Sequence, residues 1–264
     1  MLLFATFHTA LAIGSGGSAI APPAALTTKY HLGATTQQTL DLSAVGGPAQ
    51  ITNLTLDAWI VMTLTDSAGG RVVHVVVDSA RSTSDNPMAP AGDPATAKGA
   101  MIHGFQDPAG RVKNLTSSVT GNPLVAAVQG AVNGLFPRIK AGAKSGDSWV
   151  DTTDVTNPGE GNNTTAKVIT TYNAGMAESI GGNAGVHIDA KSTSVIGGSL
   201  TNPQAGQIEV EGAGGGSGSF VIGGDGRFLG GRVTSTQDLM LKVAMAPAPL
   251  PLKIVQSLAV TVIK

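Results

Sequence analysis

The chain has 264 residues, of which 42% are hydrophobic and 12% are charged, and its formal net charge is −1. Soluble domains usually carry about 25% charged residues, so we expect the outward-facing positions here to be Thr, Ser, Asn, Gln and Gly. The scattered Lys and Arg residues form no basic stripe that could neutralise a row of phosphates, which argues against nucleic acid as a partner. The absence of Cys excludes disulfides, thiolate zinc sites and thiol nucleophiles.

Residues 1–24 are predicted to be a signal-like or anchoring segment. The apolar run from Met1 to Ile13 precedes a small-residue stretch, as in a secretory signal. However, no Lys or Arg occurs before Lys29, and Pro22 follows the best cleavage site, so a retained anchor at the membrane surface is the alternative. We expect a periplasmic protein, or one on the outer face of a bacterial inner membrane, with secretion as the alternative.

Residues 25–264 are predicted to form a β domain, beginning with a series of strands rich in β-branched or alternating residues. This first series covers Ala25–Leu32, Gln37–Leu42, Ile51–Thr65, Arg71–Arg81, Met101–Gln106 and Val112–Val119. Three turns place an Asp, then a Gly, then Arg71, Arg111 or Arg227 between apolar runs, which is typical of hairpins. We interpret these Arg residues as solvated turn charges, with pairing to nearby carboxylates as the alternative.

The segment from Ser82 to Lys98 has several Pro residues and no periodicity, which predicts a long loop. A helix is predicted to begin with Asn122 as its N-cap and Pro123 at its first position, and to end near Gly134. Its apolar face consists of Leu124, Val125, Val128 and Val132.

A second strand series follows, separated by Gly-rich turns. It covers Thr165–Tyr172, Gly185–Ala190, Ser194–Leu200, Gln207–Glu211, Ser217–Ile222, Arg227–Val243 and Lys253–Ile263. The predicted fold is therefore all-β: a large curved antiparallel sheet, either a half-barrel or a β-sandwich, built from two strand series with one short helix between them. Possible lobes are 25–120 and 145–264, with the helix and a linker at 121–144.

Several short motifs occur in a characteristic order along the chain. They are Tyr30 to Gly33, a D-x-x-G turn, a helix ending in Leu135-Phe136-Pro137, Gly146 to Trp149, Thr171-Tyr172 and a late G-x-G-x-G strand. In this order the chain resembles a group of uncharacterised exported bacterial β-rich proteins. The resemblance implies export and a strand-rich curved sheet with one helix, and it transfers no catalytic residue.

The chain contains no readable catalytic motif. No His lies at metal-ligand spacing from another His or a Cys, and the acidic residues from Asp147 to Glu160 lack an EF-hand pattern, so neither a metal nor a cofactor is expected. His74 with Asp78, and His187 with Asp189, have the spacing of same-face strand pairs. The glycine-rich run 212–219 lacks the Lys and the helix of a phosphate loop, which favours a flexible turn or a Gly-lined strand.

Three functions are compatible with these patterns. The first is a non-catalytic scaffold or accessory subunit on the periplasmic side of a membrane-bound assembly, with that assembly's protein subunits as partners. The second is a carrier of an apolar ligand such as lipid, with Trp59, Phe136 and Trp149 lining its site. The third is a hydrolase with a convergent site around His74 or His187.

Overall fold

One antiparallel sheet contains all the strands of the part of the chain that the structure describes. This computed structural model describes residues 25–86, 92–134, 143–159, 162–180, 182–202, 206–244 and 246–263. The first strands along the chain are β1 (Ala25–Leu40), β2 (Gln50–Ser67), β3 (Gly70–Ser84), β4 (Met101–Gln106) and β5 (Val112–Ser117). The later strands are β6 (Ser148–Gly159), β7 (Asn162–Ile180), β8 (Asn183–Asn202), β9 (Gly206–Gly223), β10 (Phe228–Val243) and β11 (Leu250–Ile263).

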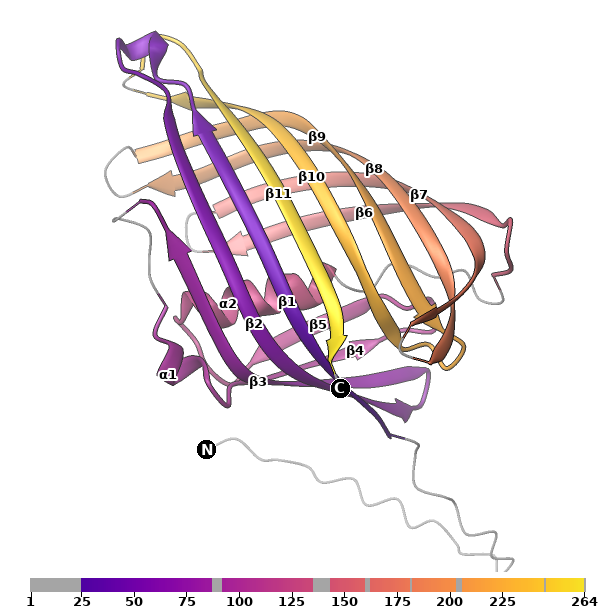
Figure 1. Ribbon diagram of the computed structural model, residues 1–264. Coiled ribbons are helices and arrows are strands. Elements are labelled where there is room, and N and C mark those ends of the chain that lie inside the picture. The colour runs from indigo at the N-terminus through magenta and orange to yellow at the C-terminus, as the bar shows by residue number, and fades with distance from the viewer. Residues whose placement is uncertain are drawn as a thin grey trace, which may run out of the picture.

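The sheet is strongly curved and unclosed, with β5 and β6 as its outer strands (Figure 1). Its strand order is β5-β4-β3-β2-β1-β11-β10-β9-β8-β7-β6, so each strand series is a meander. The two meanders join where β1 pairs with β11, from Lys29 opposite Ile263 to Leu40 opposite Leu252. The all-β prediction of two strand series with a helix between them is therefore confirmed, as one curved sheet rather than two stacked sheets.

Strand alternation gives the sheet a concave and a convex face. In β1, β2 and β11 the even-numbered residues point to the concave side, because Tyr30, Leu32, Ile60 and Val260 are buried in one core there. Residues in neighbouring strands that are opposite in register share that face. The concave side of β9 accordingly carries Gly212, Gly214, Gly216 and Gly218.

The helix α2 (Pro123–Gly134) lies on the concave side of the sheet (Figure 1). Asn122 caps it as predicted, since its Oδ1 accepts a hydrogen bond of 2.9 Å from the amide of Leu124. The helix buries the predicted apolar face, formed by Leu124, Val125, Val128 and Val132. The other helices of the described residues are short: a 3₁₀ turn at Ser43–Val45 and α1 (Pro94–Ala97).

The three predicted hairpin turns are present, and each has a glycine at positive φ, namely Gly69 (77°), Gly110 (83°) and Gly226 (79°). The interpretation of the three Arg residues as solvated turn charges was wrong, because all of them are paired. Arg71 Nε lies 2.9 Å from Asp66 Oδ1, Arg111 contacts Asp151, and Arg227 Nε lies 2.6 Å from Asp225 Oδ2.

Some element boundaries differ from the prediction. The predicted strands within β1, β8 and β9 are each parts of longer strands, because Gly and Thr continue the backbone pairing between the apolar segments. The predicted loop 82–98 contains the end of β3 and the helix α1, which Asp93 caps by accepting from the amides of Ala95 and Thr96. The polar segment after Trp149 is the edge strand β6.

Candidate ligand-binding site

A cavity of about 490 Å³ lies between α2 and the concave face of the sheet, within the size range of small-molecule sites. Four strands contribute its sheet wall, because β2, β1, β11 and β10 are successive neighbours. The apolar sheet residues that line it are Ala34, Leu54, Leu56, Val233 and Leu258. Its helix wall is formed by Ala127, Gly130, Ala131 and Gly134.

The cavity exists because this face of α2 carries only small side chains. Its four lining residues are spaced i, i+3, i+4 and i+7, so they form one stripe along the helix. A Cβ added at Gly130 would meet no atom within 4 Å, and one added at Gly134 would first meet Leu258 at 3.9 Å. Leu54 is 38% exposed although it faces the concave side. The helix therefore covers the sheet here without filling the space above it.

Beyond the cavity, toward the end of the sheet at which β1 stops, the concave face carries a second apolar cluster. Its buried members are Ile208, Val210 and Leu239. Ile196, Leu200, Leu241, Val243, Leu252 and Ile254 pack around them. The described helices pack mainly against β2, β3 and β5, so this cluster is separate from the core that they cover.

The predicted ligand-binding aromatics do not come together. Trp149 lies on the concave side of β6, where its ring stacks on Tyr172 with centroids 5.3 Å apart. Trp59 lies on the convex side of β2, with its ring centroid 4.7 Å from that of His31. Phe136 lies outside the described residues. The two Trp residues thus lie on opposite faces and neither lines the cavity, and a ligand contact at either one stays a prediction.

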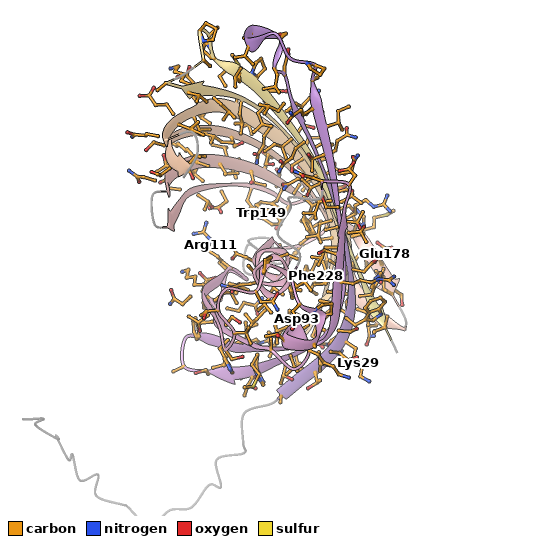
Figure 2. All side chains as sticks on the ribbon, turned by 90° about the vertical axis from the view of Figure 1, so that its left-hand side faces the viewer. Lys29, Asp93, Arg111, Trp149, Glu178 and Phe228 are labelled. Carbon is orange, nitrogen blue, oxygen red and sulfur yellow. The ribbon has the colours of Figure 1, made fainter. Side chains whose placement is uncertain are left out.

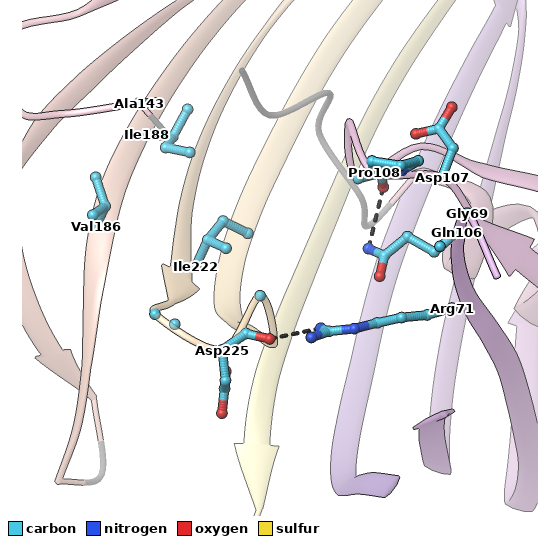
Figure 3. A pocket seen from close by; sticks show the side chains of 15 residues that line it. Gly69, Arg71, Gln106, Asp107, Pro108, Ala143, Val186, Ile188, Ile222 and Asp225 are labelled. Atoms are coloured by element: carbon cyan, nitrogen blue, oxygen red, sulfur yellow. Dashed lines mark hydrogen bonds between the residues drawn. The ribbon is translucent and has the colours of Figure 1, made fainter. Parts of the chain in front are cut away.

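A second cavity, of about 660 Å³, lies at the opposite end of the concave side (Figure 3). Its apolar wall consists of Val186, Ile188 and Ile222, and its rim consists of hairpin turns. Polar groups at the rim bond to one another: Arg71 Nη1 donates to the carbonyl of Asp225 at 2.6 Å, and Gln106 Nε2 donates to that of Gly110 at 3.2 Å. With these groups already satisfied, the smaller cavity under α2 is the better candidate for a ligand site.

A side-chain bridge connects the two outer strands on the open side of the sheet, where Figure 2 labels Arg111. Arg111 Nη2, next to β5, lies 3.3 Å from Asp151 Oδ2 in β6, and it also donates to Thr153 Oγ1. The Asp151 carboxylate is buried, whereas Arg111 is one-third exposed. The open side is therefore spanned by an ion pair where β5 and β6 do not pair through their backbones.

On the convex face, His187 lies between two carboxylates and a hydroxyl. Its Nδ1 is 2.9 Å from Glu178 Oε2, while its Nε2 is 3.1 Å from both Asp189 Oδ1 and Ser219 Oγ. The hydrogen bond that the ring donates to Glu178, followed by its hydrogen bond to Asp189 and the charges of both carboxylates, raises the pKa of His187 against the opposing effect of burial. Such an arrangement favours the imidazolium ion, which has no lone pair with which to accept a proton from Ser219.

The other predicted His–Asp pair does not form a hydrogen bond. The rings of His74 and His103 stack, with centroids 4.6 Å apart, and His74 Nε2 is buried without a hydrogen-bond partner. Among the described residues no group of three or more His, Cys, Asp or Glu side chains is placed to hold a metal ion.

Comparison with protein-family models finds no match for the chain, and a search of curated proteins finds none that is similar to it. The resemblance to exported bacterial β-rich proteins stays a prediction. No helix in the described part of the chain is long and apolar enough to span a membrane.

Replacing Arg111 with Met should destabilise the protein by roughly 1–3 kcal/mol, because it removes the Arg111 cation from the buried Asp151 carboxylate. The expected loss of stability is smaller than that for a fully buried ion pair, because Arg111 is partly exposed to solvent. Urea unfolding measures the change. The matched control is Arg81→Met, since Arg81 is 69% exposed and its contact with Asp57 is long, at 3.5 Å. Equal effects of the two substitutions would contradict the assigned role of the Arg111 bridge.

The pKa of His187 should fall in Glu178→Gln, because its strongest hydrogen-bond acceptor loses its charge. Since folding raises this pKa, the interaction stabilises the fold fully below about pH 6.5 and loses its effect as pH rises through the folded-state pKa. NMR titration of the imidazole measures the shift, with Glu211→Gln on the same face as the control. An unchanged His187 pKa in Glu178→Gln would show that the carboxylate does not act on the ring.

Proposed function

We propose that this protein is a carrier or binder of an apolar ligand, such as a lipid chain, which it holds on the concave face of its sheet under α2. The observation that carries the proposal is the cavity of about 490 Å³, whose mainly apolar walls come from four strands and one helix. An apolar chain placed there would lose its contact with water and would remove partly exposed apolar side chains such as Leu54 from water.

The rest of the concave face supports the same function. The second apolar cluster continues the apolar surface beyond the cavity, so a long ligand has more than one region to contact. The outer members of this cluster are only partly buried, so an apolar ligand that covers them would remove more apolar surface from water. A periplasmic or membrane-proximal location, as proposed from the N-terminal sequence, would place such a carrier next to a source of lipid.

Ala127→Trp should weaken binding of an uncharged apolar probe at least ten-fold, because the indole would occupy the space between α2 and the sheet. The measurement is fluorescence titration of the full chain with N-phenyl-1-naphthylamine, whose emission rises in apolar surroundings. Ala126→Trp is the matched control, since Ala126 is exposed on the same helix but does not line the cavity. Equal affinity in the two variants, or no binding by the unsubstituted protein, would contradict the proposal.

A scaffold or accessory subunit is the second candidate, and it is supported by the outer strands β5 and β6. Among the described strands each has a neighbour on one side only, and an unpaired strand edge can accept a strand from another chain. For this function we expect purification from native membranes in mild detergent to recover the protein with other subunits. Recovery as a monomer alone would contradict it.

A further inference from the structure

The concave face carries a belt of uncharged polar side chains between the cavity and the second apolar cluster. We call this set the polar belt. It comprises the polar residues of two rows that are opposite in register across β1, β11, β10, β9, β8 and β7, and the apolar residues Ile254 and Val168 lie in one of these rows. Its members are Thr36, Gln38, Thr170, Ser192, Ser194, Ser235, Gln237 and Gln256. Thr36, Ser235 and Gln256 also line the cavity.

The side chains of the polar belt have free hydrogen-bonding capacity. None of them forms a side-chain hydrogen bond to any residue that the structure describes. Together they offer hydroxyl groups, which donate and accept, and amides, which have two donors and an acceptor oxygen. Polar groups that converge on a concave face without partners of their own are available to a ligand.

Glycines in β9 allow the belt residues of the adjacent strands to approach one another. A Cβ at Gly214 would lie 2.8 Å from Ser194 Oγ and 3.1 Å from Gln237 Cγ. At Gly216 it would lie 3.1 Å from Ser192 Oγ. The polar side chains of β8 and β10 therefore lean over β9 and occupy the space that a side chain there would need.

The belt lies on strands whose described residues carry no charge on the concave side. Among the described residues of β1 and β7 to β11, every Lys, Arg, Asp and Glu is on the convex side, as the register places Lys191, Arg232, Asp238 and Lys253. The charged residue on the concave side of β6 is Asp151, which Arg111 neutralises. A charged group brought onto the concave side of these strands would lose hydration and find no counter-charge among their described residues, which is costly.

We infer that the ligand is an amphiphile whose polar part is uncharged and rich in hydroxyl groups, such as a glycosyl group, and that this part is bound by the polar belt. The apolar chain lies in the cavity under α2, so this inference rests on the function proposed above. A ligand that continues along the concave face to the second apolar cluster has to cross the belt, where its polar atoms meet free donors and acceptors.

The test compares three ligands with the same dodecyl chain by displacement of N-phenyl-1-naphthylamine from the full chain, below their micelle-forming concentrations. They are dodecyl maltoside, dodecanoate and dodecyltrimethylammonium, which carry an uncharged sugar, an anion and a cation. Dodecyl maltoside should bind at least ten-fold more tightly than the other two. The double variant S192A/S235A should lose this preference. T193V/T236V, which removes hydroxyls from the convex side of the same two strands, should keep it.

The outcomes separate the two proposals. Similar affinities for the three ligands, or an unchanged preference in S192A/S235A, would overturn the inference about the polar part while leaving apolar binding in place. Failure of all three ligands and of the probe to bind would overturn the proposed function itself.

Discussion

The backbone pairing of β1 with β11 is the interaction on which the rest of the structure depends. It joins two meanders that come from opposite ends of the described chain into one sheet. The sheet wall of the cavity draws on both of them, with Ala34 and Leu54 from one meander and Val233 and Leu258 from the other. Without this pairing, each meander alone would supply only about half of the sheet wall. The cavity under α2 would then be open on one side. A binding site under the helix is thus a property of the joined sheet.

The two faces of the curved sheet differ in charge, and the difference follows from a simple sequence pattern. Because successive side chains point to opposite faces, a two-residue alternation is enough to place charge outside and neutral groups inside along strands of up to 20 residues. Charged residues are few in this chain, and nearly all of those in the long strands lie on the convex side. The convex face can therefore remain hydrated while the concave face stays neutral.

Much of the fold could be predicted from the residues, whereas the candidate site could not. Alternation, three Asp–Gly–Arg turns and the Asn122-Pro123 helix start are local signals, and they predicted the strands, the hairpins and α2. The edge strand β6 was missed because its Asp and Thr residues lack an apolar alternation. The site depends on which distant strands become neighbours, and of the aromatic residues predicted to line it, Trp59 and Trp149 lie on opposite faces. The one local signal was the Ala and Gly stripe of α2 from Ala127 to Gly134, which indicates a helix face that leaves space.

The glycines on the concave side of β9 have a consequence for strand register. A shift of two residues keeps each side chain on its own face, and along a run of alternating glycines it would exchange one glycine for the next. The glycines in the middle of β9 therefore do little to determine its register. Its position must be fixed at its ends, by Ile208 and Val210 in the second apolar cluster and by Phe220 and Ile222 in the main core. A substitution at any of these four residues should therefore affect the register of the whole strand, because the glycines at its centre do not favour one register over another.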